Sequence, residues 1–164
     1  MTQCHPLLLL DVDGVLNPFA ARSCPPGYTE HNLFPGEEPV RLCAAHGPWI
    51  KELAPRFELV WATAWGLDAN RLLGPVLGLP DLPAIEFPPV PFDPREKLPA
   101  VMRHVGPRPL AWIDDALPPD AEAWASSRDT PTLLIDIDPA VGLTRAVVDQ
   151  ALQWADAPAL SSLR

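Results

Sequence analysis

Residues 7–17, LLLLDVDGVLN, place four leucines directly before two aspartates that one valine separates. An apolar run of this length has the size of a buried strand, and near-continuous apolar strands are typical of a parallel sheet covered on both faces. Asp11 and Asp13 would then lie at the carboxyl end of this strand, where such sheets bind their ligands. The stretch therefore predicts an α/β fold with a polar site at one edge of the sheet.

The rest of the chain alternates apolar runs of strand length with segments of helical pattern. Strands are expected at residues 7–10, 57–62, 84–87, 110–113 and 132–135. Helices are expected at residues 38–53, 67–77, 95–104, 120–126 and 144–154. This order predicts a three-layer α/β/α, Rossmann-like sandwich with a mainly parallel five-stranded sheet, formed by one domain over residues 1–164.

The composition narrows the classes of function. A formal net charge of −9 opposes binding along a nucleic-acid backbone, because that mode of binding needs clustered basic residues. The three cysteines lack C-x-x-C spacing, which predicts neither a disulfide framework nor a zinc site. The apolar run 7–10 is too short to span a membrane and follows no basic segment, so we expect a soluble, cytoplasmic protein.

Several predicted strands end in polar residues, in the strings LLLLDVD, ELVWATAW and LAWIDD. Because the carboxyl ends of parallel strands meet at one edge of a sheet, these polar groups are expected to converge. A calcium loop of the EF-hand type is the alternative for D-x-D-G. That loop needs further oxygen ligands at alternate positions, whereas Val15 and Leu16 follow here.

Four motifs in order carry a resemblance to a known family. They are DVDGV at residues 11–15, Thr63 after the second predicted strand, Lys97, and the IDD that ends at Asp115. On these motifs, which span most of its length, the chain resembles the haloacid dehalogenase (HAD) superfamily. The strings WATAW and PLAWIDD are also similar to small HAD domains associated with bacterial RNA repair proteins.

The resemblance implies a phosphoryl-transfer site. Asp11 would be the nucleophile that forms an aspartyl-phosphate, and Asp13 the general acid and base, an arrangement found in the phosphatases of the superfamily and absent from its dehalogenases. Thr63 would hold a phosphoryl oxygen, and Lys97 would steady the nucleophile and the transferred charge. Taken alone, each residue also fits an ordinary role, such as a capping acid, a turn former or a solvated helical lysine.

A metal is expected because Asp114 and Asp115 are adjacent carboxylates that would lie near Asp11. Such crowding is costly unless a cation neutralises it. Magnesium suits the oxygen ligands that Asp11, Asp114 and the backbone carbonyl of Asp13 would supply. We expect Asp114 to be the direct ligand, and Asp115 to support it or to pair with Lys97.

The substrate side of the site is less defined. Residues 17–37 hold no convincing helix pair, so a flap is expected there, with no separate cap domain. Asn17 and Trp65 are candidates, with Thr63, for binding substrate, although core packing or capping explains Asn17 and Trp65 equally well. An open site would accept a bulky phosphorylated end, or a partner subunit of a homo-oligomer would cover it.

The resulting hypothesis is a magnesium-dependent phosphatase that acts on a small phosphorylated substrate. A phosphomutase or phosphotransferase would differ only in the acceptor that reaches the aspartyl-phosphate, and the sequence does not distinguish it. Two alternatives of other classes also stay open. One is a non-catalytic binding or regulatory module that keeps the HAD fold. The other is a polynucleotide-end phosphatase of RNA repair, which the net acidity disfavours.

Overall fold

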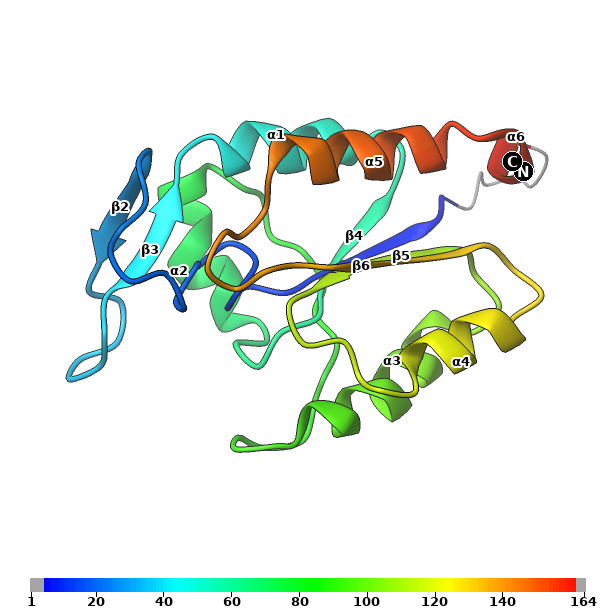
Figure 1. Cartoon of the computed structure of the whole chain (residues 1–164), viewed down its shortest axis with the longest axis horizontal. Coiled ribbons are helices and arrows are strands. Elements are labelled where there is room, and N and C mark those ends of the chain that lie inside the picture. The colour runs from blue at the N-terminus through cyan, green and yellow to red at the C-terminus, as the bar shows by residue number, and fades with distance from the viewer. Residues whose placement is uncertain (1–4, 162–164) are drawn as a thin grey trace.

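The computed structural model describes residues 5–161 and contains a central sheet of four parallel strands (Figure 1). The strands, in the spatial order of the sheet, are β4 (Glu58–Trp61), β1 (Leu7–Leu10), β5 (Leu110–Asp114) and β6 (Thr132–Asp136). The carboxyl ends of β4, β1 and β5 coincide, because Leu10 lies in register with both Trp61 and Ile113. The leucine run is therefore an interior strand, as the sequence predicts.

Helices cover both faces of the sheet (Figure 1). They are α1 (His46–Leu53), α2 (Asp68–Leu77), α3 (Lys97–Val105), α4 (Ala121–Ser127), α5 (Arg145–Ala155) and α6 (Pro158–Ser161). Alternate leucines of β1 point to opposite faces, as in any strand. Leu8 and Leu10 pack in one apolar core with residues of α1, α2 and α5, whereas Leu7 and Leu9 pack in a second core with residues of α3 and α4. The result is the expected three-layer sandwich.

The start of α3 is locally determined by the sequence. The 3-10 turn η1 (Pro94–Glu96) begins with a capping box, in which the Asp93 side chain accepts a hydrogen bond from the Arg95 N–H at 2.8 Å and Glu96 accepts one from the Asp93 N–H at 2.7 Å. These bonds satisfy donors that would otherwise lack partners at the start of a helix. Lys97 is thereby held at the first residue of α3.

The predicted fifth strand at residues 84–87 is wrong. Only Ala84 forms a bridge, with Trp61 of β4, and the ladder does not continue. Prolines at positions 83, 88 and 89 surround this segment. Because proline has no N–H to donate, it cannot extend a ladder of hydrogen bonds. The segment therefore lies along the edge strand without becoming part of the sheet.

The predicted helix at residues 38–53 is also wrong in its first half. Strand β3 (Val40–Cys43) pairs in antiparallel register with β2 (Tyr28–His31), and α1 begins only at His46. The string VRLC alternates buried and half-buried residues, which is a strand period. The other expected elements agree with the structure to within about two residues.

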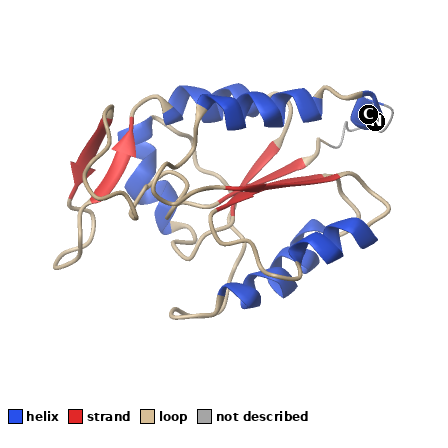
Figure 2. Cartoon of the chain, viewed as in Figure 1, coloured by secondary structure: helices blue, strands red, loops and turns tan. Residues whose placement is uncertain are grey.

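The β2–β3 hairpin stands apart from the central sheet, at one end of the molecule (Figure 2). Strand β2 falls within residues 17–37, the expected flap, so part of that segment has regular structure. Among the described residues, none of the helices has the length and apolar character needed to cross a bilayer.

Candidate active site

Polar residues from separate parts of the chain meet at the carboxyl end of β1. Asp11 follows β1, Asp114 ends β5, Thr63 comes two residues after β4, and Lys97 reaches the site from α3. All four are buried, with exposed fractions of 6% for Asp11, 0% for Asp114, 2% for Thr63 and 6% for Lys97. Charged groups are almost never this buried unless they are paired. The contacts among the aspartates and the lysine therefore show how the folded protein accommodates their charges.

Lys97 links the two buried aspartates. Its Nζ donates to Oδ2 of Asp11 at 3.0 Å and to Oδ2 of Asp114 at 2.7 Å. The second oxygen of each carboxylate accepts a backbone N–H, from Val12 at 2.7 Å and from Ala116 at 2.8 Å. Each carboxylate is thus oriented by two donors. Within the described residues Lys97 forms ion pairs with Asp11 and Asp114 and none with Asp115, so of the two roles expected for Asp115 the pairing with Lys97 is not seen.

The charges of the site do not balance. Burial, together with the neighbouring Asp114, raises the pKa of Asp11 well above its ordinary value, although Lys97 opposes the shift. Burial and the charge of Asp114 also raise the pKa of Asp115. Burial lowers the pKa of Lys97, but the attraction of Asp11 and Asp114 outweighs this effect and raises it. The ammonium therefore stays charged beside an excess of carboxylates.

These carboxylates fit a divalent cation. Asp11, Asp114 and Asp115 each offer an oxygen, and the three oxygens lie within 4.8 Å of one another. Lys97 binds two of these carboxylates, those of Asp11 and Asp114, with its single ammonium group. When all three carboxylates are ionised, the cluster therefore keeps a surplus of negative charge. Clustered carboxylate oxygens are hard ligands, which magnesium prefers over nitrogen or sulfur. The donor set and its charge thus match the expected metal.

Gly14 allows Asp115 to reach this cluster. Its φ is +80°, a conformation that residues with a side chain rarely adopt, and a Cβ at this position would collide with the Asp115 carboxyl group. The glycine of the first motif is therefore required twice, for the turn after β1 and for the close approach of an acid from the β5 end.

Asp13 lies outside this carboxylate cluster and is held by two other side chains. Its Oδ1 accepts a hydrogen bond from Asn17 Nδ2 at 2.9 Å, and its Oδ2 accepts one from Trp65 Nε1 at 3.0 Å. The Arg41 N–H of the hairpin in turn donates to Asn17 Oδ1 at 3.0 Å. The ring of Phe34 packs edge-on against Trp65, with centroids 4.9 Å apart. Asn17 and Trp65, expected to bind substrate, thus contact Asp13.

The contribution of Arg41 and Phe34 is absent from the sequence analysis. Arg41 falls in the region assigned to a helix, and the alternation of its neighbours Val40 and Leu42 was the one signal of a strand. Phe34 lies in the expected flap, where no pattern indicates a contact with Trp65.

Thr63 is the residue of the site that lines a cavity. Its Oγ1 accepts a hydrogen bond from the Trp65 N–H at 3.3 Å. Together with Ala64, Gly66 and residues 85–90, it lines a cavity of about 390 Å³, a size that holds a small ligand.

Comparison with known families identifies this arrangement. Residues 7–148 match the family described as the HAD domain in Swiss Army Knife RNA repair proteins. The chain belongs to this family. The match starts at β1 and includes Asp11, Thr63, Lys97 and Asp114, so the resemblance stated from the motifs is confirmed. Searches of curated proteins and of solved structures gave no match. Membership supports a phosphohydrolase-type function for this HAD domain, with a phosphorylated substrate.

Proposed function

We propose that this HAD domain is a magnesium-dependent phosphomonoester hydrolase that forms an aspartyl-phosphate on Asp11. The observation that carries the proposal is the buried Asp11 carboxylate, held by Lys97 and the Val12 N–H next to Asp114 and Asp115. Each oxygen of Asp11 accepts a described hydrogen bond and keeps a further lone pair, because a carboxylate offers about four acceptor sites. The nucleophile is therefore oriented without being blocked.

In the first step, an Asp11 oxygen attacks phosphorus and the bond from phosphorus to the leaving oxygen breaks. Asp13 gives its proton to that leaving oxygen, so an alcohol departs. In the second step, Asp13 takes a proton from water, whose oxygen attacks phosphorus and releases phosphate from Asp11. The hydrogen bonds from Asn17 and Trp65 direct the Asp13 carboxyl for both transfers.

The other residues stabilise charge. The ammonium of Lys97 contacts Asp11 and compensates the negative charge that develops on the phosphoryl group. Thr63, at the mouth of the cavity, offers its hydroxyl to a phosphoryl oxygen. Asp11, Asp114 and Asp115 would hold magnesium, which, when bound, neutralises their surplus charge and that of the phosphoryl oxygens.

Phosphate release from an aryl phosphate in the presence of magnesium tests this proposal. Asp11→Asn should abolish release, because an amide cannot form the phosphoryl intermediate, while the thermal midpoint of unfolding shows that the variant folds. Asp81→Asn, a change at an exposed acid outside the site, should keep full activity. Wild-type turnover in Asp11→Asn would contradict the proposal.

A second candidate, a phosphatase that acts on RNA ends, is favoured by the RNA repair proteins in which this family of domains occurs. The net charge of −9 argues against binding along a nucleic-acid backbone, but a single terminal phosphate needs no such surface. Phosphate release from oligonucleotides phosphorylated at the 5′ or the 3′ end, compared with release from mononucleotides, separates the two candidates.

A further inference from the structure

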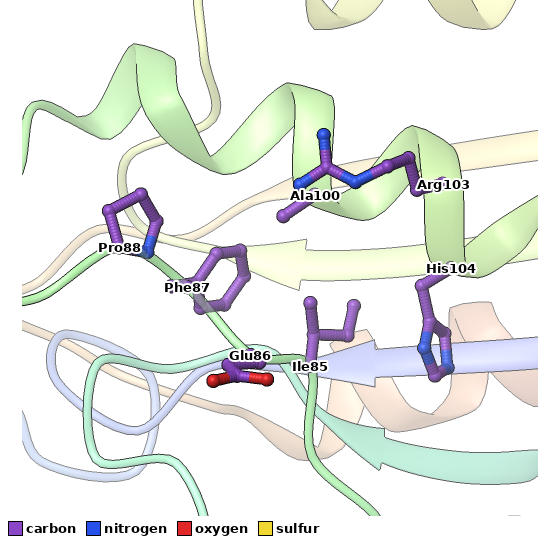
Figure 3. Close-up of a pocket in the computed structure, with 7 residues that line it drawn as sticks. All are labelled: Ile85, Glu86, Phe87, Pro88, Ala100, Arg103 and His104. Atoms are coloured by element: carbon purple, nitrogen blue, oxygen red, sulfur yellow. The ribbon is translucent and has the colours of Figure 1, made fainter.

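A second cavity lies beside the segment that follows the bridge between Ala84 and the edge strand β4. It measures about 560 Å³ and lies between the segment 85–88 and residues Ala100, Arg103 and His104 of α3 (Figure 3). The segment 85–88 also lines the cavity that Thr63 borders. The two cavities therefore lie next to each other along this segment, and we call the pair, with Thr63 on one side and Arg103 on the other, the groove.

The wall that faces α3 is apolar. Figure 3 shows the side chains of Ile85 and Phe87 pointing toward α3, whereas Glu86 points away from it. This alternation is expected of an extended segment. The Phe87 ring lies with its centroid 5.9 Å from Lys97 Nζ, the same atom that binds Asp11. The apolar wall thus begins next to the reacting centre and continues along the helix.

The basic side chain of Arg103 lines the groove from α3. Arg103 is exposed, and within residues 5–161 its guanidinium has no described hydrogen bond or ion pair, unlike those of Arg56, Arg71 and Arg145, which pair with acids. Its side chain runs back along α3 past Ala100 (Figure 3), the direction that helical side chains prefer. Arg103 follows Lys97 by six positions, which places the two residues about 9 Å apart along the helix axis.

We propose, on the basis of the proposed function, that this groove selects phosphomonoesters whose leaving group carries a second anionic group, which Arg103 binds. A planar apolar group attached to the same leaving group would lie against Ile85 and Phe87. A free guanidinium recognises phosphate through paired, charge-assisted hydrogen bonds, and the carboxylate of Glu86, which also lines the cavity, points away from α3. Nucleoside bisphosphates and sugar bisphosphates share the second anion, but only the former have the planar group.

The test compares kcat/KM for phosphate release from adenosine 3′,5′-bisphosphate, its two monophosphates and fructose 1,6-bisphosphate. Wild-type protein should prefer the nucleoside bisphosphate over either monophosphate by at least about tenfold, since tenfold equals the contribution of one charge-assisted hydrogen bond. Arg103→Gln should abolish that preference and Arg103→Lys should restore part of it. Arg71→Gln, the same change on α2, should leave the preference intact.

Equal preferences in wild type and Arg103→Gln, or no preference in wild type, would overturn the groove proposal. Preference for the sugar bisphosphate over the nucleoside bisphosphate would overturn the role of the apolar wall. Binding of adenosine 3′,5′-bisphosphate to Asp11→Asn protein, measured by calorimetry, separates this proposal from the proposed function. If no substrate is turned over, a tenfold weaker binding in Asp11→Asn/Arg103→Gln still supports the groove, and unchanged or absent binding rejects it.

Discussion

Replacement of Lys97 by methionine tests the electrostatic basis of the site. Methionine keeps most of the side-chain volume but removes the ammonium, so the Asp11 and Asp114 carboxylates lose the cation that both contact, at 3.0 Å and 2.7 Å. Removal of one partner from a buried ion pair costs about 3–5 kcal/mol. For a domain of this size, such a loss corresponds to a fall of about 6–20 °C in Tm.

The loss should depend on pH and on magnesium. Because the pKa of Asp11 in the folded protein lies above its ordinary value of 3.8, the folded state binds this proton more tightly than the unfolded state does. The contribution of Asp11 to stability therefore falls as pH rises above about 3.8. Without Lys97 the Asp11 pKa rises further, and the deficit should be larger at pH 8 than at pH 5. Magnesium binds the folded state through the same carboxylates and should restore part of the loss.

Urea denaturation at both pH values, with and without magnesium, measures these effects. Lys51→Met is the matched control, since Lys51 is the other lysine of the chain and is exposed on α1. The double variant Lys97→Met/Asp114→Asn removes one of the uncompensated acids and should recover stability relative to Lys97→Met. The reasoning is refuted if Lys97→Met and Lys51→Met differ by less than about 1 kcal/mol at pH 8 without magnesium.

Three further predictions concern Asp13, the first-motif glycine and a buried histidine. Trp65→Phe removes the donor to Asp13 but keeps an aromatic ring, so kcat for esters with poor leaving groups should fall by about 10- to 100-fold in steady-state assays. Gly14→Ala should lose about 1–3 kcal/mol in urea denaturation from backbone strain, and its collision with Asp115 should weaken magnesium binding in calorimetry. Burial lowers the pKa of His46 from 6.5, so the folded state holds fewer protons, and the free energy of unfolding should fall as pH drops through about 6.5.

Each of these predictions has a matched control. Trp49→Phe, on α1, should leave kcat unchanged, and the single-turnover phosphorylation of Asp11 by esters with good leaving groups should be insensitive to Trp65→Phe because that step needs no proton. Gly27→Ala has a similar φ of +83° with no atom within 4 Å of its Cβ, so it should lose stability without affecting magnesium binding. His46→Gln should flatten the pH dependence, whereas the change His104→Gln, at an exposed histidine, should not. For each pair, an effect in the control variant and none in the test variant contradicts the contact that the test variant removes.

Much of the fold follows from local patterns of the sequence. The run Leu7–Leu10 is apolar at every position, which suits an interior strand with a helical layer on each face. The segment 84–87 shows where such patterns fail. It is as apolar as a short strand, but neighbouring prolines leave it without a continuous ladder. A strand of the sheet needs apolar side chains that can be buried and backbone groups that can form a ladder of hydrogen bonds. The composition of a segment indicates mainly whether its side chains can be buried.

The acids and Thr63 of the site are evident from their positions at or after strand ends, because parallel strands bring their carboxyl ends to one edge, whereas Lys97 reaches the site from a helix. Which donor contacts which acceptor is not evident. Asp114 and Asp115 are neighbours in the sequence. Asp114 is nevertheless fully buried and forms an ion pair with Lys97, whereas Asp115 is half-buried and its carboxyl group lies close to Gly14. Successive side chains of an extended chain point in different directions, so adjacent acids reach different partners.

By itself, therefore, the sequence determined the four strands of the central sheet, the acids at the ends of β1 and β5, and the family. Only the tertiary structure decided that Asn17 and Trp65 hold Asp13, and that the Arg41 N–H of a hairpin supports Asn17. The physical reason is that apolar burial and backbone geometry are local properties, which a pattern of residues expresses directly. Side-chain hydrogen bonds join residues such as Asp13 and Trp65, 52 positions apart, and depend on how the completed layers pack.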